Sequence, residues 1–355
     1  MTTWFPTDRI PGAGSFIARD ALALAEDHDV AVLHFTPPEW DDGRRTVSWH
    51  GLDVRRMPLD LRRPAQAPRA RAEIERALAD RPVDVLHTMA APALLPFLVR
   101  RPGLPWVHTE HWSGVRNLAG TGRSRLVRPL ARRAFAGPGT VVAVSDYLAD
   151  AVRALRTGPT EVIGNIVDLP ADGAVSGREP RGSALRLLGV GTVNEHKGWR
   201  LAVGALSSLR DAGIDARLTW LGDGPELDEL RRVGGPLGVV APGHQPHERV
   251  RAEMAASDVF LLPTRSETFS LVTVEALASG LPVVATGQGA HTAFLTPETG
   301  VVVARDADAV ARGAQMAAAL RHDDARARGR QLAERFSEAR FRAAYRDVYE
   351  RVTRS

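Results

Sequence analysis

A single lysine, Lys197, is the residue of this chain whose type points most directly to chemistry. The chain has 46 Lys and Arg residues, and every one except Lys197 is an arginine. Lysine offers a compact ammonium where arginine offers a planar fork, and phosphate is often held by such a point charge. Lys197 stands in a glycine-flanked run, GVGTVNEHKG at residues 189–198, directly after an apolar segment. This setting predicts a phosphate-binding role for Lys197. The residue type alone would also be explained by a lysine that persisted by chance.

Two glutamates eight positions apart, Glu267 and Glu275, mark a second segment with the residue types for ligand binding. The segment reads PTRSETFSLVTVEALASGLPVVAT over residues 263–286. Its apolar start predicts a strand end, and a helix is expected from about Leu271 onward. Gly280 is the residue type that ends such a helix. The two glutamates are therefore expected on a strand-to-helix loop and on the helix itself.

The start of this helix is a predicted anion site. Ser270 is expected to cap it, and the backbone N–H groups of Phe269, Ser270 and Leu271 would point at a ligand above the helix. The helix macrodipole favours negative charge there. Glu275 would lie about one turn inside the helix, near enough to its start to reach the same ligand. We therefore expect a diphosphate at this position.

Composition excludes several kinds of chemistry. The chain has no cysteine, which rules out disulfides, thiolate metal sites and cysteine nucleophiles. The net charge is only +4 and 42 acidic residues are interspersed among the basic ones, so the sequence pI of about 10.2 does not indicate a nucleic-acid partner. No run of 18 apolar residues and no signal-peptide pattern occurs, which predicts a cytoplasmic protein.

A repeated pattern of strands and helices must position these candidate binding residues. At 355 residues the chain is long enough for two α/β domains. Short apolar, β-branched runs alternate with helical patterns, which indicates parallel sheets. These runs lie at residues 30–35, 83–88, 106–109, 141–145, 185–190, 218–221, 259–263, 283–286 and 301–304.

A stretch rich in proline and glycine, residues 168–183, interrupts this pattern and is typical of a linker. We therefore predict two doubly wound, Rossmann-like domains at residues 1–168 and 183–336, facing across a cleft. Ligands are expected at the carboxyl ends of the strands.

The two ends of the chain carry further expectations. The strand expected before Trp4 is absent or reduced to Thr2 and Thr3, so either the chain start is trimmed or that sheet edge is shortened. The last helical pattern spaces aromatic residues four apart and forms a packing face, which we expect to return to the N-terminal domain through residues 337–355; its aromatic residues are Phe341, Tyr345 and Tyr349.

Six motifs in chain order resemble those of the family 4 (group 1) retaining glycosyltransferases, whose fold of two Rossmann-like domains is called GT-B. The likeness extends over nearly the whole chain. The six motifs are the glycine-rich loop at 11–16, the strand ending in serine at 141–145, the hinge at 163–168, the lysine loop at 189–198, the strand end at 222–226 and the paired-glutamate segment at 263–286.

The resemblance implies a role for each matching residue. Lys197 would neutralise the diphosphate of a nucleotide-sugar donor as it leaves, Glu275 would bind the ribose hydroxyls, and Glu267 would bind hydroxyls of the donor sugar. Gly12 and Gly14 would allow a loop to approach sugar and phosphate closely. No cofactor and no metal ion are expected.

A histidine near the end of a predicted strand completes the implied site. His111 matches the family's active-site histidine, near the sugar and acceptor, while His108 alternates inward and is expected to be a satisfied core residue. The family's usual arginine after the second glycine of the lysine loop is replaced by Thr192, so one phosphate-binding cation is missing. Thr268 and Ser270 replace two family glycines, and residues 287–292 lack the family's usual glutamate.

Two further motifs each have a structural interpretation and a functional one. Asp306 and Asp308 have the spacing of a metal-binding pair, but their place at a predicted helix start favours capping. Residues 123–135 carry five arginines beside aliphatic residues. A solvated helix with arginine stems lying along apolar surface explains this stretch, and peripheral contact with the inner membrane face is the alternative.

The sequence thus predicts a retaining glycosyltransferase that moves a sugar from a UDP- or GDP-sugar to an acceptor hydroxyl. The acceptor, whether a small molecule, a glycan or a lipid-linked compound, cannot be named from these residues. Two alternatives remain: a nucleotide-sugar epimerase, and a noncatalytic sugar-nucleotide-binding protein, which the missing cation at Thr192 suggests.

Overall fold

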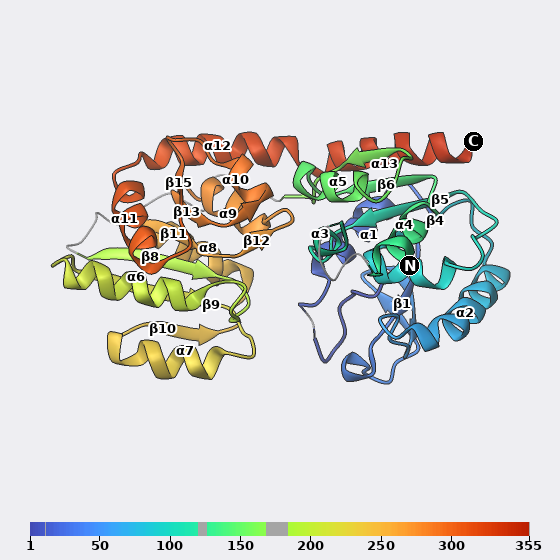
Figure 1. Cartoon of the computed structure of the whole chain (residues 1–355), viewed down its shortest axis with the longest axis horizontal. Helices are drawn as coiled ribbons and strands as arrows, with labels where there is room; N and C mark the ends of the chain where they lie inside the picture. Colours follow the sequence, from blue (N-terminus) through green and yellow to red (C-terminus); the bar gives the residue numbers. More distant parts are fainter. Residues whose placement is uncertain (11, 120–125, 168–183, 355) are drawn as a thin grey trace. The chain divides into compact units, whose positions relative to one another are not determined.

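The chain forms two compact units in the computed structural model, which describes residues 1–10, 12–119, 126–167 and 184–354 (Figure 1). Unit 1 comprises Met1–Ile166 and Glu338–Ser355, and unit 2 comprises Val167–Ser337. The predicted linker at 168–183 lies outside the described residues. Among the described helices, none is both long and apolar enough to cross a membrane.

Unit 1 is built on two groups of strands joined by the chain start. The first group has the order β1-β3-β2 and the second is a parallel sheet with the order β4-β5-β6-β7. Thr2 makes parallel bridges to His34 of β1 and to Met89 of β4, so the expected first strand is reduced to a bridge at Thr2. The strands are β1 (Ala31–Phe35), β2 (Thr46–Trp49), β3 (Leu52–Met57), β4 (Leu86–Met89), β5 (Trp106–Glu110), β6 (Thr140–Ala143) and β7 (Thr160–Val162).

Helices cover these strands with their apolar faces. The described α-helices of unit 1 are α1 (Ser15–Ala25), α2 (Ala67–Asp80), α3 (Val115–Ala119), α4 (Arg128–Phe135), α5 (Asp146–Arg153) and α13 (Glu338–Thr353), and the 3₁₀ helices are η1 (Pro38–Trp40), η2 (Pro64–Gln66) and η3 (Ala91–Phe97). The aromatic stripe of α13 packs as expected: Phe341 and Tyr345 are buried against Val107 of β5 and Val142 of β6, and Tyr349 is partly buried beside them.

Unit 2 contains one six-stranded parallel sheet in the order β10-β9-β8-β11-β13-β15. Its strands are β8 (Leu185–Val190), β9 (Ala216–Leu221), β10 (Val240–Gly243), β11 (Val259–Leu262), β13 (Val283–Thr286) and β15 (Gly300–Val303). A two-stranded ribbon of β12 (Ser266–Glu267) and β14 (Gln288–Gly289) lies beyond the carboxyl ends of β11 and β13. Chain order reverses between β8 and β11, as in doubly wound nucleotide-binding folds.

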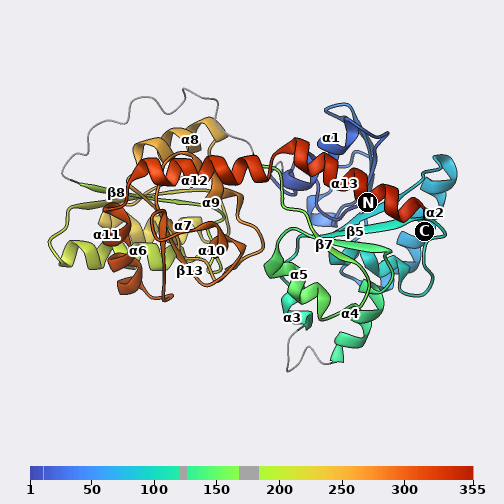
Figure 2. The same cartoon turned by 90° about the horizontal axis from the view of Figure 1, so that it is seen from above.

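Helices lie on both faces of this sheet. The elements are α6 (Trp199–Asp211), α7 (Leu227–Gly234), η5 (Gly235–Leu237), α8 (His247–Ala256), α9 (Leu271–Ala278), α10 (Ala290–Phe294), α11 (Ala307–Ala318) and α12 (His322–Arg335). Figure 2 shows α6 and α11 on one side of the strands and α8 and α12 on the other. The prediction of an α/β chain with two Rossmann-like units is confirmed.

Candidate active site

The residues predicted to bind diphosphate meet at the switch point of the unit 2 sheet. The lysine loop follows β8, and the loop with Glu267 follows the neighbouring strand β11. Both strands are parallel, so both loops leave the sheet at the same edge. Ligands of doubly wound sheets bind at this position, outside the carboxyl ends of the strands.

An ion pair joins the two loops. The Nζ atom of Lys197 lies 2.6 Å from Oε1 of Glu267. The side chains are 25% and 11% exposed, so the pair is largely shielded while the lysine retains access to solvent. The sequence places the two residues 70 positions apart, and the fold brings the predicted cation and the predicted sugar-binding carboxylate together.

Backbone contacts hold the two loops in register. The backbone N–H of Lys197 donates to Oδ1 of Asn194 at 3.0 Å, which closes the lysine loop on itself. The N–H of Arg265 donates to the carbonyl of His196 at 2.9 Å, and Nε2 of His196 lies 2.9 Å from the carbonyl oxygen of Ser266. The site is therefore preorganised by main-chain geometry.

Gly198 makes this close approach possible. Its φ of 76° is in the left-handed region, and a Cβ added there would lie 2.0 Å from the carbonyl oxygen of Pro263. Any other residue would push the lysine loop away from the β11 loop. Glycine at this position thus fixes the distance between Lys197 and Glu267.

The helix of the paired-glutamate segment begins where the sequence predicted. α9 starts at Leu271, and Gly280 follows its end with a φ of 77°. Glu275 is half-buried within the helix, about one turn after its start. This part of the predicted geometry is confirmed.

The expected cap by Ser270 is wrong in its chemistry. Ser270 occupies the N-cap position, but its side chain accepts no backbone hydrogen bond; its Oγ instead lies 2.8 Å from Oγ1 of Thr273. The cause is the backbone of Ser270, which has φ 76° and ψ 72°, a conformation usually left to glycine. The N–H of Thr273 donates to the carbonyl of Ser270 at 3.1 Å, and the Ser270 side chain takes up none of the N–H groups at the helix start.

Phe269, two residues before α9, is a buried packing residue. The ring is 2% exposed and packs edge-on against Phe294 and Phe336, with centroids 5.3 Å and 4.8 Å away. This aromatic cluster anchors the loop immediately before α9.

His291, which the sequence did not single out, belongs to the same site. It is fully buried, and Nε2 lies 3.0 Å from the carbonyl oxygen of Thr286, while Nδ1 has no hydrogen-bond partner. Burial lowers the pKa of His291, and the charges of Glu267 and Lys197 act on it. The signal in the sequence was its position after two glycines at the end of β13.

In unit 1, His111 lies directly after the carboxyl end of β5. It is 5% exposed, and its ring packs at a tilt of 44° against Phe16 of α1, with centroids 4.9 Å apart. Its Nε2 is 3.8 Å from Oδ2 of Asp20, and neither ring nitrogen has a hydrogen-bond partner. Sequence reasoning missed Asp20, which is 91 positions away in α1.

The contact between His111 and Asp20 is not an ion pair at neutral pH. Burial raises the pKa of Asp20 to about 8 and lowers the pKa of His111 to about 3. Both groups are therefore neutral near pH 7. A neutral imidazole and a protonated carboxyl are the forms available for proton transfer or hydrogen bonding at this strand end.

The structure also describes three other unit 1 residues that the sequence singled out: Gly14, Gly12 and His108. Gly14 is the N-cap of α1 with φ 65°, and a Cβ there would lie 2.5 Å from the carbonyl carbon of Trp4, so this position requires glycine. Gly12 is exposed with open space around it. Pro11, the start of the predicted loop, lies outside the described residues. His108 is a fully buried core residue, as expected, with Nδ1 3.0 Å from the hydroxyl of Thr88 and Nε2 3.3 Å from Glu110.

The remaining sequence motifs lie outside this geometry. Thr192 is exposed on the lysine loop. Asp306 caps α11 by accepting from the N–H of Ala309 at 2.8 Å, whereas Asp308 accepts from the hydroxyl of Ser208 at 2.7 Å and caps nothing. Within the part of the chain that the structure describes, no three His, Asp or Glu side chains are grouped as metal ligands.

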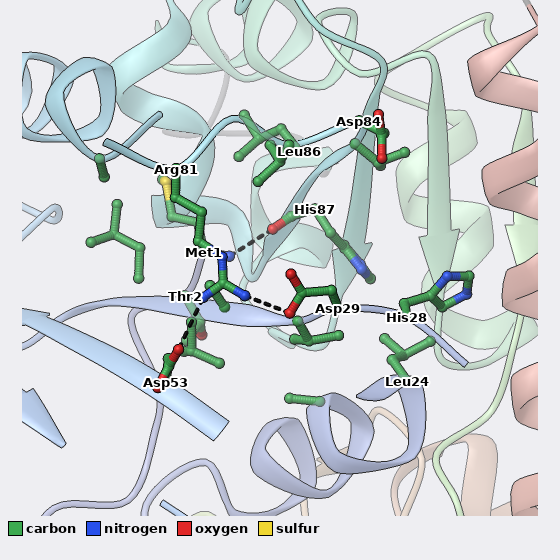
Figure 3. Close-up of a pocket in the computed structure, with 18 of the residues that line it drawn as sticks. Met1, Thr2, Leu24, His28, Asp29, Asp53, Arg81, Asp84, Leu86 and His87 are labelled. Atoms are coloured by element: carbon green, nitrogen blue, oxygen red, sulfur yellow. Dashed lines mark hydrogen bonds and ion pairs between the residues drawn. The ribbon is translucent and has the colours of Figure 1, made fainter. Parts of the chain in front are cut away.

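A cavity of about 1010 Å³ lies elsewhere in unit 1, between α1, β1, β3, β4 and α13 (Figure 3). The Met1 ammonium donates to the carbonyl of His87 at 2.7 Å within it, and burial lowers the pKa of this amine to about 5. Arg81 forms ion pairs with Asp29 and Asp53 at its wall. Neither His111 nor Gly14 lines the cavity, and we assign it no substrate.

Comparison with solved structures defines the class of the protein. Sucrose-phosphate synthase from Thermosynechococcus elongatus matches with a TM-score of 0.77 at 20% identity, over 95% of this chain and 92% of that one. HepE from Anabaena, in complex with UDP and glucose, matches with a TM-score of 0.71 at 18% identity, over 97% of each chain. At such identities the likeness concerns the fold alone, and that fold is GT-B.

Sequence comparison then gives the family. "Glycosyltransferase Family 4" matches residues 10–170, and "Glycosyl transferases group 1" matches residues 184–319. The chain belongs to the family 4 (group 1) glycosyltransferases, which confirms the resemblance seen in the motifs.

Curated relatives match this chain over alignments of different length. Glycogen synthase from Mycobacterium tuberculosis (strain CDC 1551 / Oshkosh) is 28% identical over 363 residues, which cover 90% of this chain and 84% of that protein. The GDP-mannose-dependent alpha-(1-6)-phosphatidylinositol monomannoside mannosyltransferase from Mycolicibacterium smegmatis is 28% identical over 91% of this chain and 92% of its own length. The 2-deoxystreptamine glucosyltransferase from Streptomyces kanamyceticus is 38% identical over 104 residues, and the match spans only 27% of its length.

Proposed function

We propose that the chain transfers a sugar from a nucleoside diphosphate donor to an acceptor hydroxyl and retains the anomeric configuration. The observation that carries the proposal is the contact of Lys197 with Glu267 beside the start of α9, at the switch point of the unit 2 sheet. A cation, a carboxylate and a helix N-terminus are the groups needed for a diphosphate joined to a hydroxylated sugar. UDP- and GDP-sugars are the donors we propose first.

In this reaction the bond between the anomeric carbon and the diphosphate oxygen breaks, and a bond from the same carbon to the acceptor oxygen forms on the same face. The acceptor proton passes to the departing phosphate oxygen. Lys197 and the N–H groups at the start of α9 stabilise the negative charge that develops on the leaving group, in place of a metal ion. Glu267 binds hydroxyls of the donor sugar and holds the ammonium of Lys197 in position.

His111 is proposed to act on the acceptor side of the reaction. Because burial keeps its imidazole neutral, with a pKa of about 3, the ring can accept or donate a hydrogen bond without carrying charge. Thr192, where the family's arginine is absent, leaves Lys197 as the cation that we assign to the diphosphate. We therefore expect binding of the nucleotide to depend strongly on polar contacts outside the lysine loop.

Glu275→Ala is expected to weaken nucleotide binding about tenfold or more, because a charge-assisted hydrogen bond to a ribose hydroxyl contributes roughly 1.5–3 kcal/mol. The turnover number at saturating donor should change less than the affinity. Calorimetric titration with UDP and GDP measures the effect, and Glu334→Ala, on α12 of the same unit, is the control with the same charge change. An unaltered nucleotide affinity in the Glu275 variant would contradict the ribose assignment.

The stereochemical outcome tests the proposed function itself. Proton NMR of reactions with UDP-, GDP-, ADP- and TDP-sugars and a panel of hydroxyl acceptors should show a product with the anomeric configuration of the donor. An inverted product would exclude the same-face mechanism. Epimer formed from the donor alone would favour an epimerase, and nucleotide binding without turnover over the whole panel would favour a noncatalytic binding protein.

A further inference from the structure

The surface of α4 in unit 1 exposes aliphatic side chains that a solvated helix would normally bury. Leu126, just before the helix, is 87% exposed, and Leu130 within it is 49% exposed. Val99, two residues after the end of η3, is 92% exposed. Isolated exposed aliphatic residues are ordinary, but a group of them on one small surface marks an interaction site.

These residues lie together because the segment after η3 packs against α4. The Nε atom of Arg133 donates to the carbonyl of Leu98 at 2.6 Å, and Nη2 of Arg101 donates to the carbonyl of Ala136 at 2.9 Å. We call this surface the α4 patch and define it by its exposed apolar and basic members, Val99, Arg100, Arg101, Leu126, Val127, Leu130, Arg132 and Arg133.

The opposite side of α4 anchors the patch to the core. Ala131, Ala134 and Phe135 are buried, and Phe135 packs edge-on against the buried ring of His108, with centroids 5.6 Å apart. Figure 2 shows α13 on one side of β5 and β7 and α4 on the other. The helix that carries the patch is thus packed on the core of unit 1.

The charge of this part of the chain has one sign. Residues 111–145 include six arginines and no aspartate or glutamate. Elsewhere in the chain acidic and basic residues are interspersed, and arginines on α7, such as Arg231 and Arg232, pair with carboxylates three positions away. The patch itself exposes the side chains of Arg100, Arg101, Arg132 and Arg133, and such a basic surface attracts anions over a distance of about a Debye length.

We propose that the α4 patch docks on a membrane surface that contains anionic lipids. Arginine side chains would bind lipid phosphates while Leu126, Leu130 and Val99 enter the boundary between headgroups and acyl chains. The aliphatic members favour lipid over nucleic acid, because a nucleic-acid surface offers no apolar layer for such side chains. Membrane docking is independent of the proposed sugar transfer and can be measured without any substrate.

Flotation of the full chain with vesicles tests the proposal. We expect binding to vesicles of phosphatidylcholine and phosphatidylglycerol in equal amounts, and much weaker binding to phosphatidylcholine alone. Arg132→Ser should weaken binding about fivefold, the effect of one basic residue near an anionic surface. Leu126→Ser should also weaken it, because less apolar surface would enter the lipid.

Matched controls come from exposed residues of unit 2. Arg232→Ser on α7 removes the same charge, and Met316→Ser on α11, where the side chain is 59% exposed, removes a similar apolar surface. Neither should change vesicle binding. Equal binding of all four variants would overturn the proposal. It would also be overturned if Arg132→Ser weakened binding to RNA and Leu126→Ser left vesicle binding unchanged, since the patch would then serve a polyanion.

Discussion

Replacing Lys197 with alanine is expected to lower the turnover number of sugar transfer by about 10²–10³-fold. The ammonium lies 2.6 Å from Oε1 of Glu267, the carboxylate that we propose binds the donor sugar, and it comes from the loop after β8. The diphosphate gains negative charge in the transition state. Loss of the Lys197 ammonium therefore destabilises the transition state more than it destabilises the bound donor. Steady-state kinetics with the best donor of the panel measures this effect, with a smaller change expected in KM.

A structural explanation must be separated from a chemical one, because Lys197→Ala leaves Glu267 without its cation at 11% exposure. The double variant Lys197→Ala with Glu267→Gln removes this unpaired charge and should recover thermal stability but not turnover. Arg265→Ala is the matched control, since Arg265 is a cation of the adjoining loop that pairs with Glu195. Turnover in the Lys197 variant equal to that of the control would remove the lysine from the mechanism.

Asp20→Asn is expected to stabilise the folded chain at alkaline pH far more than at acid pH. Burial raises the pKa of Asp20 from 3.8 to about 8, so the folded chain keeps a proton that the unfolded chain releases. The stability associated with this proton is fully present below about pH 3.8 and is lost as the pH rises to about 8. Asparagine does not titrate, and the variant should gain about 1.4 kcal/mol relative to the wild type for each pH unit in that window.

Urea unfolding of the two proteins at several pH values between 4 and 9 measures the difference. Asp84→Asn, an exposed aspartate of the same unit, is the control with the same charge change. A pH-independent difference between the Asp20 variant and the wild type would show that Asp20 has an ordinary pKa. The pairing inferred for Asp20 and His111 as two neutral groups would then be wrong.

The central strands were predictable because a buried parallel strand is a continuous apolar run. The runs at 185–190 and 259–263 became β8 and β11, and their order placed the site at the switch point. Two strands without such a run were not found: β3, the middle strand of its sheet, contains Asp53, Arg55 and Arg56, and the edge strand β10 contains Pro242. Part of β3 is exposed, so its apolar pattern is broken, and an edge strand such as β10 tolerates proline because one side of its backbone is unpaired.

Within the site, the residue types were predictable and the local conformations were not. The sequence identified Lys197, Glu267 and Glu275 by type and spacing, yet the contact between the first two depends on two loops that meet only after folding. Ser270 was expected to act as an ordinary cap because serine is a common N-cap residue, although the family glycine that it replaces was a signal for a positive φ. Asp20 and His291 escaped notice because their importance comes from burial beside partners distant in sequence or on another loop.

The buried amine of Met1 affects how the chain can be handled in the laboratory. An affinity tag fused before Met1 would convert this amine to an amide at a position that lines the cavity and contacts the carbonyl of His87. The fusion would remove the cost of burying an ionisable amine, but it would also place foreign residues beside the edges of two strands. Purification handles at the two termini should therefore be compared by thermal melting before kinetic data are collected.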